Sequence, residues 1–294
     1  MNKIYKYVIA DRIDILENCQ LRITQPKYLN DPFDSVLSFK KVVEKELFLK
    51  HFNSDKIFES IISKFTEVMD SNNRTNGTNY TLNSFLEGQG KTLEEFRTHF
   101  STVIGSFVDS FTEENPAIKS LFNEEINKFL GIISFTESPD NIPMWAYYAD
   151  VYKGFVLTFN TEHQFFNNSL LVDKDFGSLH KIVYSPEKTV LDSLKNFQSN
   201  PFFEKHIRWV NEEEWRMILP LSLAQSKKFP DIYLISIPPE IITGIIFGFR
   251  CNPQLIDYVR ELKTKNNIWQ HLELSIAIPK LDKYKMDVIN IESV

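Results

Sequence analysis

The chain has 294 residues, of which 43% are hydrophobic and 14% aromatic, so it has enough apolar side chains for a sizeable core. Its net charge of −6 argues against broad, sequence-independent binding of nucleic acid, which depends mainly on Lys and Arg neutralising phosphates, but does not exclude a local basic groove. With Cys19 and Cys251 as its cysteines, the sequence predicts neither a disulfide framework nor a cysteine zinc site, and it favours free thiols over one pairing.

The sequence shows no targeting or membrane segment. Residues 1–7 contain basic side chains but no apolar stretch follows them, so no signal peptide is expected. No run approaches the roughly 18 apolar residues that a membrane span needs. The apolar stretch at residues 232–249 is interrupted by two prolines and a glutamate. We therefore expect a cytoplasmic protein that does not interact with membranes.

The first 40 residues are predicted to contribute two strands to the core. Residues 4–8 form the first strand, a short helical piece follows, and residues 21–24 form the second strand, which ends before Pro26. The loop at residues 28–34 contains an Asn-Asp-Pro sequence, which is typical of a tight turn. This loop could serve only as a turn or could contact a ligand, and the residues alone leave both open.

Residues 42–130 have helical periodicity. Apolar residues recur at helical spacing through residues 57–69, and a polar loop is expected at residues 71–80. Thr92 and Glu95 form a capping box that opens the next helix, and another helix follows it. The Phe-rich faces of these helices are more typical of packing than of a cofactor site. We predict that residues 42–130 are a helical insertion or subdomain.

Strand character returns at residues 131–136, which contain the hydroxyl of Ser134. A helix is expected at residues 143–149, where Trp145 and Tyr148 are three residues apart and so share a face. Further strands are expected at residues 155–159, 181–184, 231–237, 241–249 and 271–278, with a helix at residues 253–263. Because regular βαβ repeats and a Gly-rich strand-to-helix turn are absent, the sequence indicates an α+β fold. We expect a single domain, 1–294, with core strands at 1–40 and 131–294.

The segment 205–220 is the strongest candidate for a functional strand. Its second half alternates apolar and polar residues, as a half-buried strand does. If the strand begins by Glu212, then Glu212, Glu214 and Arg216 point the same way. Two neighbouring carboxylates are unfavourable unless a cation or a ligand uses them. These residues could therefore form a salt-bridged strand face or line a cleft.

Missing motifs exclude several reaction classes. The sequence contains no P-loop, no G-x-G-x-x-G after a strand and no G-x-S-x-G nucleophile turn. Its six His residues never occur at metal-ligand spacing, so no metal site is expected. The remaining candidate residues are distributed along the chain: Tyr5, Lys6, Tyr7, Asn30, Asp31, Ser134, Trp145, Tyr148, Glu212, Glu214 and Arg216.

In chain order these residues belong to the motifs Y-K-Y, N-D-P-F-D, I-S-F-T-E, M-W-A-Y-Y-A-D-x-x-x-G and K-x-x-x-W-x-x-E-x-E-W-R. Each motif alone is weak, but together they resemble a large bacterial family described only as a domain of unknown function. The resemblance covers roughly residues 3–35 and 131–220. The helical middle and the C-terminal quarter of the chain lie outside its motifs.

The layout also resembles the ADP-ribosyltransferase superfamily, and in particular its DNA-modifying toxins. This resemblance implies a mixed, mostly antiparallel split β-sheet core with a helical insertion. It implies Glu214 as the catalytic residue on a late strand, with Glu212 completing a Glu-x-Glu pair. It also implies NAD as a substrate.

The same resemblance implies contacts with NAD. The residues expected to bind it are Tyr5, Lys6, Tyr7, Asn30, Asp31, Ser134, Trp145, Tyr148 and Arg216. The first three would lie near the nicotinamide ribose, and Trp145 and Tyr148 around the nicotinamide or the target. Arg216 would orient the carboxylates or contact the pyrophosphate through its planar fork. Lys6 stands where the superfamily usually has His or Arg.

These expectations lead to an NAD-dependent ADP-ribosyltransferase, a bacterial toxin or phage-defence effector that modifies nucleic acid or protein. A fixed carboxylate can stabilise the oxocarbenium-like ribosyl cation that forms when the nicotinamide–ribose bond breaks, and Glu212 could deprotonate the acceptor. One alternative is a non-catalytic nucleotide- or partner-binding module in a defence or toxin–antitoxin system, with an antitoxin or regulator as partner. A second alternative is purely structural: Glu212 and Arg216 form a surface ion pair, and the aromatic residues of the motifs belong to the core.

Overall fold

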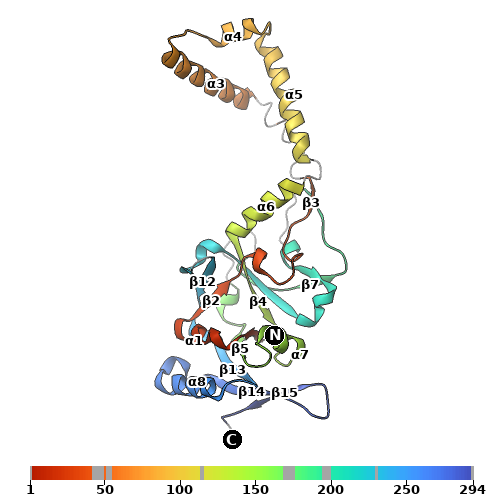
Figure 1. Ribbon diagram of the computed structural model, residues 1–294, viewed down its shortest axis with the longest axis vertical. Helices are drawn as coiled ribbons and strands as arrows, with labels where there is room; N and C mark the ends of the chain where they lie inside the picture. The colour runs from red at the N-terminus through yellow and green to blue at the C-terminus, as the bar shows by residue number, and fades with distance from the viewer. Residues whose placement is uncertain are drawn as a thin grey trace. The chain divides into compact units, whose positions relative to one another are not determined.

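The computed structural model describes residues 2–41, 50, 55–112, 116–167, 176–193, 200–228 and 231–292. The chain divides into two compact units, shown in Figure 1 and described separately below. Unit 1 contains Met1–Val36, Asn123–Thr189 and Gln198–Val294, and unit 2 contains Leu37–Phe122 and Val190–Phe197. Within the described ranges, every helix is too short or too polar to cross a membrane.

Unit 1 is built around an eight-stranded sheet with the strand order β15-β14-β13-β5-β1-β4-β10-β6. Its strands are β1 (Lys3–Val8), β4 (Leu130–Thr136), β5 (Phe155–Asn160), β6 (Leu179–Lys181), β10 (Glu214–Pro220), β13 (Ile242–Gly248), β14 (Glu273–Pro279) and β15 (Met286–Asn290). Neighbouring strands are antiparallel except β13 and β14, which are parallel. The fold is therefore α+β with a large, mostly antiparallel sheet, which confirms the predicted fold class at this level.

Smaller elements of unit 1 surround this sheet. A three-stranded sheet has the order β11 (Ser226–Lys228), β12 (Ile232–Ser236), β2 (Gln20–Ile23). Strands β7 (Val183–Ser185) and β9 (Glu204–His206) pair in parallel. The helices include α1 (Asp14–Asn18), α7 (Ile142–Tyr148) and α8 (Pro253–Lys265). Pro253 follows the N-cap of α8, where its missing N–H costs no hydrogen bond.

Side chains alternate between the two faces of the large sheet, and each face carries its own buried cluster. Phe155, Leu157 and Phe159 of β5 contribute to the larger cluster, which also contains residues of α1, β2 and α8. Val156, between them in sequence, belongs to a second cluster with Trp145 of α7. This period of two is the one expected of a strand that is covered on both faces. The apolar stretches predicted as strands at 131–136, 155–159, 241–249 and 271–278 all lie in this sheet.

Unit 2 contains the Phe-rich helices α3 (Asp55–Asn76), α4 (Leu82–Gly88), α5 (Leu93–Thr112) and the first part of α6 (Pro116–Phe129). Its two short strands, β3 (Phe39–Lys41) and β8 (Leu191–Ser193), pair in parallel. The rings of Phe65 and Phe85 meet edge-to-face with centroids 5.3 Å apart. These Phe side chains pack against one another, as expected for residues of this segment.

Two predicted details of unit 2 have different outcomes. The capping box of α5 is confirmed: the Thr92 N–H donates to the Glu95 carboxylate over 2.7 Å, and the Glu95 N–H donates to the Thr92 hydroxyl over 3.2 Å. The loop predicted at 71–80 is wrong in its first half, because α3 continues to Asn76. The Asn73 side chain then accepts from the N–H of Tyr80 over 3.0 Å and so closes the turn. Residues 42–49, 51–54 and 113–115 of the predicted insertion lie outside the described residues.

The strand predicted at residues 181–184 is two strands in different sheets. Strand β6 pairs with β10, whereas β7 pairs with β9. Between them the Ile182 N–H donates to the carbonyl of Glu214 over 2.9 Å, and the next N–H, of Val183, donates to Phe203. The chain therefore leaves the edge of the large sheet at Ile182, a change of partner that local sequence does not encode.

Gly154 allows the start of β5 to approach β1 closely. A Cβ atom at this position would lie 2.1 Å from the carbonyl oxygen of Val8 and 3.0 Å from the Cα atom of Ile9, and neither backbone atom can rotate away. We expect Gly154→Ala to lower the free energy of unfolding by at least about 1–3 kcal/mol, as overpacking does. Gly88→Ala, where a Cβ meets nothing within 4 Å, should be neutral or slightly stabilising. Urea denaturation of both variants tests this, and equal midpoints would contradict it.

Candidate functional site

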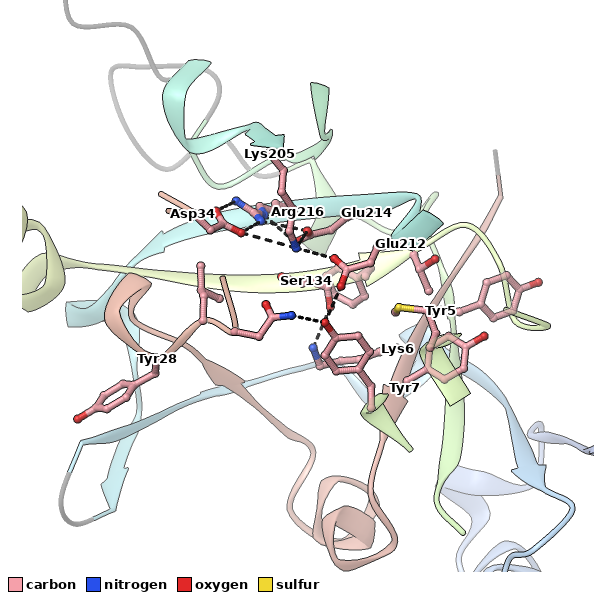
Figure 2. A pocket seen from close by; sticks show the side chains of 16 residues that line it. Tyr5, Lys6, Tyr7, Tyr28, Asp34, Ser134, Lys205, Glu212, Glu214 and Arg216 are labelled. Carbon is pink, nitrogen blue, oxygen red and sulfur yellow. Dashed lines mark hydrogen bonds and ion pairs between the residues drawn. The ribbon is translucent and has the colours of Figure 1, made fainter. Parts of the chain in front are cut away.

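The candidate site lies on one face of three neighbouring strands of unit 1, which Figure 2 shows from close by. In the register of these strands, Tyr5 of β1 and Glu214 of β10 both pair with Thr136 of β4. Arg216 pairs with Ser134 one step along the same two strands. Because side chains on a strand alternate, these residues project from the same face of the sheet.

A cavity of about 260 Å³ opens over this face. The predicted site residues that line it are Tyr5, Lys6, Tyr7, Asn30, Ser134, Tyr148, Glu212, Glu214 and Arg216. They come from segments that are far apart in the sequence, and all of them belong to unit 1. The fold therefore gathers most of the predicted residues around one hollow.

Glu212 reaches the cavity from a different element than predicted. The expectation that β10 begins by Glu212 is wrong, because the strand begins at Glu214 and Glu212 ends the 3-10 helix η6 (Ile207–Glu212). Between them Glu213 has φ 45°, in the left-handed region, and its N–H donates to the carbonyl of Val210. The turn at Glu213, rather than strand alternation, brings Glu212 to the same hollow as Glu214.

Arg216 is the centre of a buried ion network. Its Nε donates to Glu214 Oε1 over 2.6 Å and its Nη2 to Glu214 Oε2 over 3.0 Å. Its Nη1 donates to Asp34 Oδ1 over 2.7 Å, and its Nη2 also binds the second oxygen of Asp34. Nη1 also donates to the Ser35 hydroxyl and to the carbonyl of Phe202. The guanidinium is thus fully bonded and buried, and it joins β10 to the loop after residue 30.

Lys205 of β9 is the second buried cation. Its Nζ donates to Glu212 Oε2 over 2.5 Å and to Glu214 Oε2 over 2.9 Å, and lies 3.7 Å from Asp34 Oδ2. Burial opposes its charge, but Glu214 and Glu212 outweigh burial and raise the pKa of Lys205. Three carboxylates therefore share two cations in the site. Among the described residues, no group of three or more His, Cys, Asp or Glu side chains is placed to hold a metal ion.

Glu214 stays ionised in this network. Burial would raise its pKa, but Arg216 and Lys205 outweigh burial and hold the pKa of Glu214 at about 2. The hydroxyl of Ser134 also bonds to this carboxylate and favours its charged form. The same carboxylate therefore carries a full negative charge at neutral pH, although it is almost completely buried.

The low pKa of Glu214 predicts an acid-sensitive fold. Because this pKa is about 2 in the folded chain and 4.5 in the ordinary case, the ionised form stabilises the fold above pH 4.5. As the pH falls from 4.5 towards 2, the unfolded chain takes up the proton first, and stabilisation on the order of 3 kcal/mol is lost. Urea denaturation across this window should show the decline, and Arg216→Met should flatten it. A wild-type midpoint that does not change between about pH 5 and pH 3 would contradict this.

Tyr148 links Glu212 to the loop at Asn30. The Asn30 amide donates to the Tyr148 hydroxyl over 2.5 Å, and that hydroxyl donates to Glu212 Oε1 over 2.5 Å. Burial, and then the bond to Glu212, raise the pKa of the Tyr148 phenol well above its usual value, so the hydroxyl keeps its proton. One oxygen of Glu212 therefore contacts a neutral donor and the other contacts Lys205.

Lys6 is a third cation of the cavity wall. Unlike Lys205 and Arg216, it forms no ion pair with a carboxylate among the described residues. Its Nζ donates to the carbonyl of Ser134 over 2.8 Å and lies 5.6 Å from the ring centre of Phe135. Burial, and then the charge of Arg12, lower the pKa of Lys6 to about 8, although Glu214 acts in the opposite direction. Lys6 therefore loses its proton more easily than an ordinary lysine, and while protonated it offers a positive charge to an anionic ligand.

Two of the predicted NAD contacts, Trp145 and Asp31, do not line this cavity. Trp145 is 0% exposed, and its Nε1 donates to the carbonyl of Pro139 over 2.9 Å. It packs edge-to-face on Tyr7, with ring centroids 5.2 Å apart. Asp31 closes its own turn, because its carboxylate accepts from the N–H of Phe33 over 2.9 Å. Trp145 and Asp31 therefore shape the core and the loop that carry the cavity residues.

Tyr7 lines the cavity but is largely a structural residue. Its hydroxyl donates to the carbonyl of Ser138 over 2.9 Å and accepts from the N–H of Asn141 over 3.1 Å. The Asn141 side chain in turn caps α7 by accepting from the N–H of Met144. Tyr7 thus fixes the segment between β4 and α7, and with it the position of Tyr148.

A family model described as Protein of unknown function (DUF2971) matches residues 144–217. The match begins in α7 and ends in β10, so it contains Tyr148, Lys205, Glu212, Glu214 and Arg216. It is consistent with the expected resemblance to a domain of unknown function. None of the curated proteins and none of the solved structures matches the chain.

Sequence reasoning missed two members of the ion network, Asp34 and Lys205. Both belong to the sequence motifs: Asp34 is the second Asp of N-D-P-F-D, and Lys205 is the first residue of K-x-x-x-W-x-x-E-x-E-W-R. Lys205 lies inside the DUF2971 match and Asp34 outside it. A buried Arg with a bidentate acidic partner is a recurrent arrangement. The sequence signal was therefore an acidic residue in a loop motif, without any indication of which cation it would bind.

Proposed function

We propose that this cavity binds NAD and that the protein transfers ADP-ribose from NAD to an acceptor. The proposal is supported by the convergence of aromatic, amide and ionised carboxylate groups around one hollow, in the chain order that first suggested the ADP-ribosyltransferase resemblance. The observation that carries it is the Glu212 carboxylate, which lies at the cavity wall between Tyr148 and Lys205. Such a fixed negative charge is what a developing ribosyl cation requires.

The two carboxylates differ in their freedom to meet a substrate. Both oxygens of Glu214 bind Arg216, and one also binds Lys205. Glu212 makes a single bond through each oxygen, and its side chain is 12% exposed. We therefore assign the contact with the nicotinamide ribose to Glu212. In this proposal Glu214 acts through Arg216 and Lys205 as a positioning residue that holds the site ionised.

The proposed reaction breaks the bond between the ribose anomeric carbon and the nicotinamide nitrogen. The bonding electron pair leaves with nicotinamide, which becomes neutral, and the ribosyl group carries positive charge in the transition state. Glu212 stabilises that charge, and a lone pair of the acceptor then forms the new bond to the anomeric carbon. The acceptor proton passes to Glu212 or to water. Tyr5, on the cavity wall, offers a ring against which nicotinamide can stack.

The proposal is tested by incubating the purified protein with NAD and measuring free nicotinamide by chromatography, alongside calorimetric titration of NAD. We expect binding and slow release of nicotinamide even without an acceptor, because water can attack the same carbon. If the protein neither binds NAD nor releases nicotinamide, the proposal is overturned. The role as a toxin or phage-defence effector is supported by the sequence resemblance alone, and growth arrest on expression that depends on Glu212 would test it.

The ion network also favours a second candidate, a nucleotide-binding module without catalysis. Glu214 and Arg216 are buried and bind each other through two hydrogen bonds, so neither side chain needs to react with a ligand. The cavity could then recognise a nucleotide without catalysing a reaction. In that case NAD would bind without turnover and expression would be harmless. The same titration and chromatography separate this candidate from the transferase.

A further inference from the structure

A second hollow, of about 550 Å³, adjoins the cavity. The residues common to both are Asn30, Met144, Tyr148 and Glu212. The bonded chain of Asn30, Tyr148 and Glu212 therefore forms a partition with one space on each side. A ligand in either space would touch the same carboxylate.

The second hollow has an aromatic and cationic wall. Tyr147 of α7 is 76% exposed and lines it, as do Trp209 and Arg208 of η6. The Lys205 Nζ lies 5.1 Å from the ring centre of Trp209, so a cation already occupies one side of that indole. Within the described part of the chain, neither the Tyr147 ring nor the Arg208 guanidinium has a side-chain partner. Two flat rings and one unpaired guanidinium thus face a common space.

This chemistry fits a nucleotide better than a basic side chain. A planar base gains stacking energy against indole and phenol rings, and a guanidinium binds phosphate through two parallel hydrogen bonds. A lysine or arginine side chain could also stack on these rings, but Arg208 would repel it. The amide group of Asn211 in the same wall can donate to and accept from the edge of a base, whereas the Asn141 amide is already bonded to the N–H of Met144 and the carbonyl of Asn211.

Size gives a separate reason for a second subsite. The first cavity, at about 260 Å³, is below the roughly 300–1,000 Å³ of pockets that enclose a drug-sized ligand. A dinucleotide is larger than such a ligand, so only its nicotinamide riboside end fits there. The remainder, or a nucleotide of an acceptor, needs the space beyond the partition.

We propose that the second hollow is a nucleotide subsite, in which a base stacks on Trp209 and Tyr147 and a phosphate binds Arg208. The inference rests on the proposed function only for the source of this nucleotide. That source is either the adenosine end of NAD or a nucleotide of a nucleic-acid acceptor. The shared wall at Glu212 places either one next to the proposed reaction centre.

Titration of AMP into the purified protein tests the subsite directly. We expect Trp209→Ala and Tyr147→Ala each to weaken AMP binding by about 10-fold, as the loss of one stacking partner does. Arg208→Gln should weaken AMP more than adenosine, since adenosine lacks the phosphate. Tyr284→Ala and Arg260→Gln remove an exposed aromatic and an exposed cation elsewhere and should bind AMP as the wild type does. Tyr147→Ala keeps the test valid if Trp209→Ala fails to fold, because Tyr147 is a surface residue.

The two sources differ in steady-state kinetics. If the hollow holds the adenosine end of NAD, Trp209→Ala raises the KM for NAD in nicotinamide release. If it holds the acceptor, Trp209→Ala leaves that KM unchanged and abolishes labelling of a single-stranded oligonucleotide. AMP that fails to bind the wild type, or binds all variants equally, overturns the subsite. AMP binding that depends on Trp209, without any nicotinamide release, supports the subsite and overturns the proposed function instead.

Discussion

Replacing Glu212 with glutamine is expected to lower the rate of nicotinamide release from NAD by about 100-fold or more, the typical effect of removing one group that stabilises transition-state charge. The amide keeps the shape of the side chain and can still accept from Tyr148, but it carries no negative charge for the ribosyl cation. We expect kcat to fall far more than KM changes, since the lost interaction strengthens only as the bond breaks.

Glu213→Gln is the matched control, because Glu213 is the neighbouring carboxylate and is exposed to solvent. It should retain wild-type activity. Near-UV circular dichroism of both variants verifies that the aromatic packing around the cavity is intact. Equal rates for Glu212→Gln and Glu213→Gln would remove Glu212 from the proposed mechanism.

Replacing Arg216 with methionine is expected to lower the free energy of unfolding by about 3–5 kcal/mol, the usual effect of removing one partner of a buried ion pair. The change leaves the carboxylates of Asp34, Glu214 and Glu212 with Lys205 as their remaining partner in the network. It also leaves the carbonyl of Phe202 without the guanidinium donor. Urea denaturation at neutral pH measures the loss.

Arg260→Met supplies the comparison. Arg260 lies on α8, and its ion pair with Asp257 is exposed, with 3.4 Å between the charged atoms. Exposed pairs of this kind contribute at most about 1 kcal/mol. If Arg216→Met unfolds with the same midpoint as Arg260→Met, the buried network does not stabilise unit 1.

Local sequence was sufficient to predict the strands and helices whose spacing of apolar residues follows from their burial. The apolar run in residues 155–159 predicts a strand, and in the structure that strand, β5, is buried on both faces. The Phe spacing predicts the long helices of unit 2, and the reciprocal bonds of Thr92 and Glu95 define where α5 begins. In each case the information lies within a few residues of the feature that it determines.

The geometry of the site depends on contacts that local sequence does not encode. Asp34 and Arg216 are 182 positions apart, and nothing near either residue indicates their pairing. Glu213 adopts a left-handed conformation that favours Gly or Asn, so the turn that aims Glu212 could not be predicted from residue type. Trp145 and Tyr148 share α7 and pack against the same buried cluster, yet only Tyr148 also lines the cavity. Spacing alone does not show which of the two reaches the cavity.

The most direct measurement is a crystal structure of the protein with NAD bound. The proposed function predicts the nicotinamide ribose in the cavity on the face of β1, β4 and β10, with a ribose hydroxyl within hydrogen-bonding distance of Glu212. NAD bound outside this cavity, with the Glu212 carboxylate still held only by Tyr148 and Lys205, would contradict it.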